Sequence, residues 1–178
     1  MKIISGTLKG RKIDGYEVEG TRPTMDRVRE SLFAMLQDKI KGSICLDLFS
    51  GTGSLGFESI SNGASFCYFN DINNICIKNI KKLINEFNIS DKCYVFNERY
   101  DIVLDKIDKK LDIVFLDPPY KMEVNNEIID LLEEKSLLKT GSLIVCEMDH
   151  NYLIDHNNYK IVKERKYGNK IIVIIEKL

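Results

Sequence analysis

Short apolar runs alternate with amphipathic segments along most of the chain after about residue 42. The apolar runs are rich in β-branched and aromatic residues, which is typical of strands. Five strands are predicted, at residues 43–50, 65–71, 92–97, 111–117 and 142–148. Helices are predicted between them, at roughly 54–62, 73–87, 99–108 and 124–135. Strands that are apolar on both faces and separated by helices predict a parallel sheet that is covered on both sides.

The segment before the first predicted strand has a helical pattern of its own. Apolar residues recur at helical spacing from Val28 to Leu36, which predicts a leading helix over residues 23–41. We expect Thr24 to be its N-cap and Asp26 to lie in its first turn, where the helix dipole favours an acid.

The two ends of the chain complete a single predicted domain over residues 1–178, with its main core in residues 42–178. Residues 1–22 read as a small irregular or hairpin-like extension that carries basic side chains. At the other end, residues 159–166 and 170–178 are strand-like and flank a YGN turn. An antiparallel hairpin at an edge of the sheet is therefore predicted.

Composition describes an ordinary soluble globular domain, with 44% hydrophobic and 30% charged residues. The formal net charge of −1 argues against a protein that coats nucleic acid over its whole surface. Basic residues do concentrate in residues 1–12 and again in residues 160–170. These segments are either solvated surface charge or two flanks of a binding site for a polyanion.

Cysteine usage and hydropathy indicate the compartment. The five cysteines form no CxxC pair, which predicts reduced, buried thiols in a cytoplasmic protein. With only two histidines, a histidine-based metal site is not expected. No apolar stretch approaches the ~18 residues of a membrane span, and no signal-peptide core is present.

A glycine-rich loop follows the first predicted strand, in the stretch LDLFSGTGSLGFES of residues 46–59. Gly51, Gly53 and Gly56 form G-x-G-x-x-G at a strand-to-helix junction, where backbone N–H groups can approach a ligand. Asp71 ends the next strand, where an acid can accept hydrogen bonds from ribose hydroxyls. This arrangement predicts a cofactor that contains a nucleoside.

Asp47 precedes the glycines within the first strand, and two roles are open to it. Its carboxylate either reaches the cationic amino-acid tail of a cofactor or supports the loop. An amino-acid tail would disfavour a dinucleotide oxidoreductase, which remains an alternative to be tested by binding of NAD.

Residues 115–122 read FLDPPYKM and spend two of the three prolines of the chain in one place. Asp117 ends the fourth predicted strand, at the sheet edge where open α/β folds bind their ligands. A rigid strand-ending turn would explain Pro118 and Pro119, because proline fixes φ and removes a donor. It does not explain the flanking Asp117 and Tyr120.

This motif resembles the [DN]PP[YF] of class I S-adenosylmethionine-dependent methyltransferases that modify exocyclic amino groups. In that group, the acidic side chain and the backbone carbonyl after it accept the two hydrogens of an –NH₂ group. The aromatic residue stacks on the base, which must leave its helix or loop to arrive. The resemblance implies S-adenosylmethionine as cofactor and no metal.

A closer resemblance covers nearly the whole chain, on the segments IISGTLKGRKI, TRPTMDRVRESLF and DLFSGTGSLG. Together with DPPY, a Glu that ends strand five (Glu147) and the Tyr167–Gly168 turn, they resemble the RsmD family of bacterial 16S rRNA guanine-N2 methyltransferases. The resemblance implies an α/β, Rossmann-like, mostly parallel seven-stranded sheet. It also implies 16S rRNA in the 30S subunit as partner, and nothing in the sequence demands more than a monomer.

The resemblance implies three groups of site residues. Cofactor binding is expected from Asp47, Phe49, Gly51, Thr52, Gly53, Asp71, Ile72, Arg99, Tyr100 and Asp117. Catalysis is expected from Asp117, Pro118, Pro119 and Tyr120. Contacts with substrate RNA are expected from Lys9, Arg11, Lys12, Arg22, Pro23, Thr24 and Arg27, although each basic side chain could equally be solvated surface charge.

Two departures from the family pattern and two rival functions stay open. Arg99 and Tyr100 stand where many methyltransferases offer an Asp or Asn to the adenine, and Asp71 lacks the second acid of its relatives. One rival is an adenine-N6 methyltransferase, which the absence of a separate target-recognition domain disfavours for DNA. The other is a non-catalytic module that binds nucleosides or RNA.

Overall fold

The computed structural model describes residues 1–14, 22–119, 122–150, 152–153 and 157–178, with the backbone alone for residues 22–25. In this part of the chain, seven strands form one sheet in the order β3-β2-β1-β4-β5-β7-β6. The strands are β1 (Ile44–Asp47), β2 (Phe66–Asn70), β3 (Cys93–Phe96), β4 (Leu111–Leu116), β5 (Leu138–Met148), β6 (Tyr159–Tyr167) and β7 (Lys170–Lys177). The helices are α1 (Arg22–Ile40), α2 (Ser54–Ser61), α3 (Asn74–Glu86), α4 (Tyr100–Val103) and α5 (Asn125–Glu134), with a short 3₁₀ turn at Ser90–Lys92.

The sheet has the predicted mixture of directions. β1 to β5 pair in parallel, whereas β7 is antiparallel to both β5 and β6. The predicted C-terminal hairpin is therefore confirmed, and it inserts β7 between β5 and the edge strand β6. As a result, β7 begins at the same edge of the sheet at which the parallel strands end.

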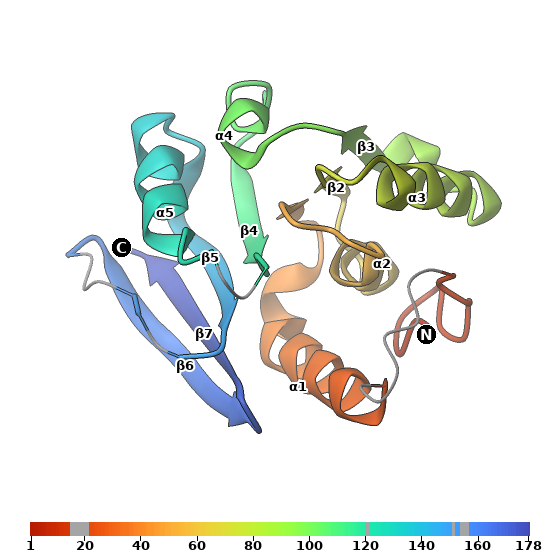
Figure 1. Cartoon of the computed structure of the whole chain (residues 1–178), viewed down its shortest axis with the longest axis horizontal. Coiled ribbons are helices and arrows are strands. Elements are labelled where there is room, and N and C mark those ends of the chain that lie inside the picture. Colours follow the sequence, from red (N-terminus) through yellow and green to blue (C-terminus); the bar gives the residue numbers. More distant parts are fainter. Residues whose placement is uncertain (15–21, 120–121, 151, 154–156) are drawn as a thin grey trace.

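Helices cover both faces of the sheet, as predicted (Figure 1). One core cluster joins α1, α2 and α3 to one face, and it includes Leu36, Phe57 and Phe115. A second cluster joins α4 and α5 to the opposite face, around Val114 and Ile128. Because neighbouring positions along each strand serve opposite clusters, the strands are apolar throughout.

Two predicted boundaries are wrong. The helix expected over 99–108 is only the single turn α4, after which the chain continues as a turn. β5 begins at Leu138 rather than at residue 142, because Gly141, with φ of +86°, and a register shift against β4 let the strand continue through a polar stretch. A bulge of this kind breaks the alternation that sequence reading depends on.

The expected start of the leading helix is also wrong. α1 already begins at Arg22, so Thr24 lies inside the helix and Asp26 lies beyond its first turn. Pro23 permits this early start, because a proline in the first turn gives up no intrahelical hydrogen bond. Asp26 instead pairs with Arg29, at 3.1 Å between Oδ1 and Nη2.

Residues 1–14 fold back on themselves as a small hairpin-like extension, as expected. Lys2 and Lys12 form a single antiparallel bridge, and the N–H of Ile3 donates to the carbonyl of Arg11 at 2.9 Å. Ile3 and Ile13 are buried in the cluster that contains α1 and α2. The extension is thus packed onto the domain.

The five cysteines are free thiols. Cys45, Cys67 and Cys146 are buried, and burial raises the pKa of each of these thiols. Cys76 and Cys93 are only partly buried, so the expectation of buried thiols is correct for three of the five cysteines and wrong for these two. No helix within the described residues has the length and apolar character that would let it cross a membrane.

Candidate active site

Two of the three glycines of the motif shape the loop after β1. Gly51 and Gly53 have φ of +51° and +80°, and Gly53 caps the N-terminus of α2 in the left-handed region. Gly56 serves packing instead, since a Cβ there would lie 2.2 Å from a ring carbon of Phe69. The motif therefore combines a tight turn with a close approach of helix to sheet.

The buried side chain of Asp47 supports this loop through a hydrogen bond. Its carboxylate is 2% exposed and accepts a hydrogen bond from the N–H of Gly56 at 3.0 Å. Burial is the main reason that the pKa of Asp47 rises to about 7. Of the two roles considered for this residue, the geometry supports the role in holding the loop.

Asp71 lies immediately after β2 and is fixed from two sides. Its Oδ2 accepts from the N–H of Gly51 at 2.8 Å, and its Oδ1 accepts from the N–H of Asn73 at 2.8 Å. Each carboxylate oxygen has a second lone pair that a ribose hydroxyl can use. The residue is partly exposed and lines the pocket described below.

Asn70 ties together the ends of three strands, and sequence reasoning missed it. Its amide nitrogen donates to the carbonyls of Leu48 and Glu98, at 3.1 Å each. Its amide oxygen accepts from the N–H of Glu98 at 3.1 Å. The available signal was a polar residue inside the apolar β2, directly before Asp71.

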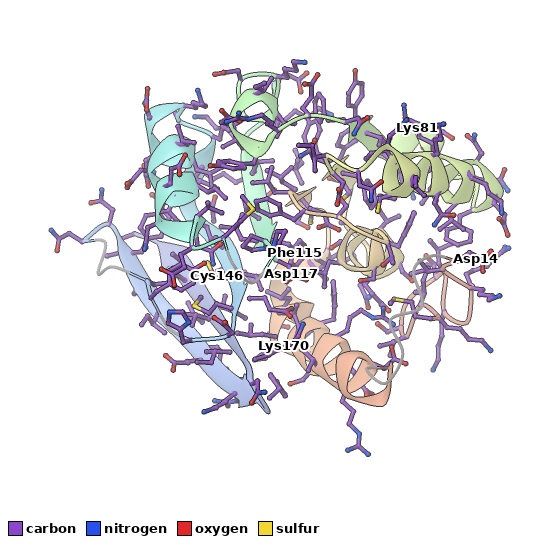
Figure 2. The ribbon with its side chains drawn as sticks, in the orientation of Figure 1. Asp14, Lys81, Phe115, Asp117, Cys146 and Lys170 are labelled. Carbon is purple, nitrogen blue, oxygen red and sulfur yellow. The ribbon has the colours of Figure 1, made fainter. Side chains whose placement is uncertain are left out.

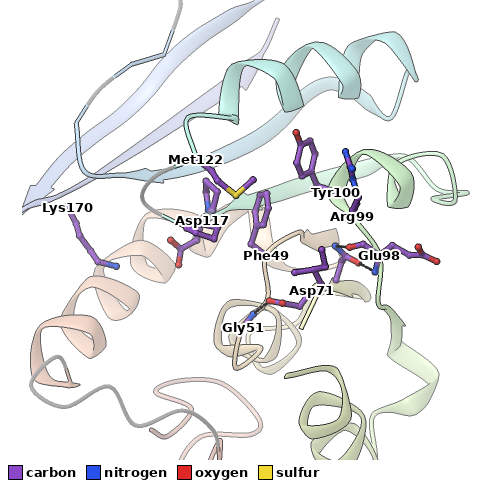
Figure 3. Close-up of a pocket in the computed structure, with 13 residues that line it drawn as sticks. Phe49, Gly51, Asp71, Glu98, Arg99, Tyr100, Asp117, Met122 and Lys170 are labelled. Carbon is purple, nitrogen blue, oxygen red and sulfur yellow. Dashed lines mark hydrogen bonds between the residues drawn. The ribbon is translucent and has the colours of Figure 1, made fainter. Parts of the chain in front are cut away.

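A pocket of about 670 Å³ opens at the C-terminal edge of the parallel strands (Figure 3), a volume typical of sites for small molecules. It is lined by Phe49, Gly51, Asn70, Asp71, Ile72, Glu98, Arg99, Tyr100, Asp117, Pro118, Pro119, Met122 and Lys170. Nine of these were predicted, whereas Asn70, Glu98, Met122 and Lys170 were not.

Three predicted cofactor residues do not line the pocket. Asp47 is buried beneath the loop, and Gly53 is buried at the start of α2. Thr52 turns toward the N-terminal extension, where its hydroxyl lies 3.9 Å from the sulfur of Met1. These residues shape the loop rather than the surface of the pocket.

One end of the pocket presents the apolar surfaces of Phe49, Ile72 and Tyr100 beside polar side chains that follow β2 and β3. The rings of Phe49 and Tyr100 pack with their centroids 5.9 Å apart, and the Tyr100 hydroxyl donates to Glu127 at 3.0 Å. Ile72 is 72% exposed. Arg99 pairs with Asp101 at 3.0 Å, so its planar guanidinium is held at the rim by a carboxylate.

The opposite end of the pocket gathers charge. Asp117 follows β4 and Lys170 begins β7, and both are labelled in Figure 2. In Figure 3 the ammonium of Lys170 points toward the Asp117 carboxylate. Lys170 forms an ion pair with Glu147, which lies near the end of β5. Burial, and then the negative charge of Glu147, raise the pKa of Asp117, whereas Lys170 opposes that rise.

The DPPY motif itself is only partly in view. Pro118 is buried and Pro119 is exposed, and both line the pocket directly after Asp117. Tyr120 lies outside the described residues, so its expected place against the base stays a prediction.

The predicted RNA-contacting residues whose side chains are described do not line the pocket. Lys9, Arg11 and Lys12 are exposed on the N-terminal extension, and Arg27 is exposed on α1. Lys12 pairs with Asp14 at 3.1 Å, and Arg11 lies over the ring of Phe87. The side chains of Arg22, Pro23 and Thr24 lie outside the described part of the structure.

Known proteins resemble this chain over almost its full length. A family model described as conserved hypothetical protein 95 matches residues 1–176. Ribosomal RNA small subunit methyltransferase D of Buchnera aphidicola is 38% identical over 170 residues, which cover 95% of this chain and 88% of that protein. The protein of the same name from Haemophilus influenzae is 36% identical and covers 94% and 89%. The chain belongs to the RsmD family.

Solved structures of similar proteins confirm the fold. A methylase from H. influenzae superposes with a TM-score of 0.85 at 32% identity, covering 99% of this chain and 98% of that one. A protein described as a methyltransferase from Escherichia coli superposes with a TM-score of 0.88 at 28% identity, covering 99% and 97%. The predicted class I methyltransferase fold is therefore correct for this RsmD family member.

Across the described residues, no group of three or more His, Cys, Asp or Glu side chains is placed to hold a metal ion.

Proposed function

We propose that this RsmD family member transfers a methyl group from S-adenosylmethionine to the N2 amine of a guanine in 16S rRNA, of the guanine-966 type. The observation that carries the proposal is the meeting of Asp117 with the glycine loop and Asp71 in one pocket. The same cavity contains a carboxylate that can accept hydrogen bonds from an amine and a group of residues suited to bind a nucleoside. The names of the curated relatives, as small-subunit rRNA methyltransferases, support the class of substrate.

The residues present fit the cofactor. Asp71 offers carboxylate oxygens to ribose hydroxyls, and the backbone of Gly51 lies beside it. Phe49 and Ile72 offer an apolar surface on which an adenine ring can pack. When bound, S-adenosylmethionine supplies a methyl group on a sulfonium sulfur, which is activated toward a nitrogen nucleophile.

The order of the strands indicates which part of the pocket would hold the cofactor and which part would hold the target base. β3 and β2 lie on one side of β1, and β4, β5 and β7 lie on the other. We therefore place the adenosine half of the cofactor over Asp71 and the target base over Asp117. The glycine loop after β1 lies between the two halves.

Asp117 orients the target amine. The lone pair of an aromatic amine is delocalised into the ring, so the nitrogen is a poor nucleophile until its geometry changes. The Asp117 carboxylate and the carbonyl of Pro118 accept its two hydrogens and aim the lone pair toward the methyl donor. The ammonium of Lys170 favours the ionised, accepting form of Asp117.

We further propose the assembled 30S subunit as the substrate, and a monomer working in the cytoplasm as the active form. A domain of this size encloses little RNA, so a folded ribonucleoprotein surface would supply the rest of the recognition. The exposed basic residues of the N-terminal extension support contact with a polyanion.

The test is transfer of labelled methyl groups to 30S subunits that lack the modification. Naked 16S rRNA and duplex DNA run beside them, followed by nucleoside analysis of the product. We expect N2-methylguanosine, formed faster on 30S subunits than on naked rRNA. Formation of N6-methyladenine would overturn the choice of base, and binding of S-adenosylmethionine without any transfer would favour the non-catalytic module.

A further inference from the structure

An ion pair stands at the end of the pocket that is farthest from the ribose acid. Glu147 lies near the end of β5, and Lys170 is the first residue of the neighbouring antiparallel strand β7. Their side chains are only 13% and 22% exposed, and Lys170 lines the pocket. In Figure 3 its ammonium points toward the carboxylate of Asp117.

A largely buried ion pair adds little net stability to a sheet. Two charges lose much of their hydration there, and apolar side chains of similar volume often stabilise as well or better. On the same face of β7 as Lys170, Ile172 and Ile174 are buried apolar side chains, so this strand is also packed without charges. A pair retained beside Asp117 therefore suggests recognition of a polar ligand.

Guanine offers a matching polar edge. Along its Watson–Crick edge it presents the N2 amine as donor, N1–H as donor and O6 as acceptor. Enzymes that extract a base from its stack read this edge with hydrogen bonds. The pocket presents Asp117 as acceptor and Lys170 as donor, and Glu147, the ion-pair partner of Lys170, is a second acceptor behind them.

The order of these groups also matches. β4, β5 and β7 are consecutive neighbours in the sheet, so Asp117, Glu147 and Lys170 follow one another along its edge. N2, N1 and O6 follow one another in the same sense along guanine. Adenine would instead turn the lone pair of N1 toward the Glu147 carboxylate, which would repel it.

We propose that Glu147 and Lys170 read the Watson–Crick edge of the target guanine, with Glu147 accepting N1–H and Lys170 donating to O6. The inference rests on the proposed function, because it assumes that Asp117 receives the N2 amine. It adds the source of selectivity for guanine over adenine, which the DPPY motif alone does not provide.

The test compares guanine with 2-aminopurine at the target position of a ligated rRNA substrate. 2-Aminopurine keeps the 2-amine that would be methylated, but it lacks both O6 and N1–H. A site that reads these groups should give the wild-type enzyme a preference for guanine of about 10- to 100-fold in kcat/KM. Lys170→Met should reduce that preference to a few-fold by slowing transfer to guanine more than transfer to 2-aminopurine.

The ratio between the two bases separates recognition from other roles. Loss of Lys170 also raises the pKa of Asp117, but this slows transfer to both bases alike. A double variant, Glu147→Leu with Lys170→Met, removes both charges so that neither stays buried alone, and it should likewise lose the preference. Lys177→Met is the matched control, since Lys177 pairs with Glu133 at the far end of β7, and it should keep the wild-type ratio.

Two failures can be told apart. If wild-type enzyme forms N2-methylguanosine but Lys170→Met retains the full preference for guanine, this inference is wrong and the proposed function stands. A wild-type enzyme with no preference for guanine over 2-aminopurine would overturn it equally. If the wild-type enzyme forms no N2-methylguanosine on any RNA, the proposed function fails and this inference fails with it.

Discussion

Asp117 is the residue on which the proposed chemistry depends. Replacing it with alanine removes an acceptor that the target amine needs, while the cofactor cradle around Asp71 stays in place. We expect Asp117→Ala to reduce methyl transfer by at least about 100-fold, and to change the dissociation constant for S-adenosylmethionine by much less than that. Transfer assays and calorimetry measure the two effects.

An exposed acid supplies the control for that variant. Asp38 lies on the outer surface of α1, so Asp38→Ala should behave as the wild type in both assays. Full activity of Asp117→Ala would show that its carboxylate does not receive the amine.

A second prediction at the scale of one residue concerns the protonation of Asp47. Its pKa in the folded protein is about 7, against an ordinary value of 3.8. Between these values the folded protein holds a proton that the unfolded chain has released. Its contribution to stability is therefore present below the lower value and is lost as pH rises through the upper one.

We expect Asp47→Asn to flatten the fall in the free energy of unfolding across this pH window. The amide oxygen of Asn can still accept the N–H of Gly56, so the loop keeps its support. Urea unfolding at a series of pH values measures the slope. The same slope in the variant as in the wild type would contradict the assignment, and Asp38→Asn supplies the unchanged reference.

At the scale of elements, α1 and α2 are joined to the N-terminal extension by one buried cluster of charges. Glu58 of α2 is 1% exposed and accepts from the N–H of Ile4. Arg29 of α1 lies 3.4 Å from Glu58 and donates to the carbonyl of Lys2 at 2.6 Å. Arg29, in the TRPTMDRVRESLF segment that carries the family resemblance, thus connects α1 to α2 and to the N-terminal extension.

Removing one partner of this pair should cost much more than removing a surface charge. Glu58→Ala leaves Arg29 buried with less compensation, and we expect a loss of about 3 kcal/mol in the free energy of unfolding. Amide exchange at Ile3 and Ile13 should quicken as the extension loosens. Glu86→Ala, at an exposed position of α3, should change neither quantity, and an equal loss there would contradict the argument.

The elements also show why sequence reading succeeded in part. The glycine loop, Asp71 and Asp117 were found because each follows an apolar strand, a relation that local pattern reveals. Lys170 was missed because it begins a strand, and only the antiparallel insertion of β7 beside β5 brings that beginning to the pocket. The start of α1 was misplaced because Thr24 is a good cap by type, whereas Pro23 let the helix begin earlier.

At the scale of the whole molecule, the N-terminal extension carries a concentration of basic side chains that is separate from the charged end of the pocket. Residues 1–14 carry four basic side chains against Asp14 alone, and Lys9 and Arg11 are exposed. Contacts of such side chains with phosphates raise affinity without regard to sequence, and salt weakens them.

We expect Lys9→Ala to weaken binding to rRNA about equally for all sequences, and to reduce the slope of affinity against salt by about one. Binding titrations at several salt concentrations measure both. Lys110→Ala is the control, because Lys110 directly precedes β4 and lies outside the N-terminal extension. Equal effects of the two substitutions would show that the extension has no special part in holding RNA.

The insertion of β7 between β5 and β6 has a consequence for how the protein is made. During translation β7 emerges after both of its neighbours, so until then β5 is an open edge and β6 has no strand beside it. The nascent chain can assemble its parallel strands and glycine loop early, but Lys170 enters the pocket only with β7. The lining of the pocket is thus complete only after β7 has been synthesised and has inserted between its two neighbours.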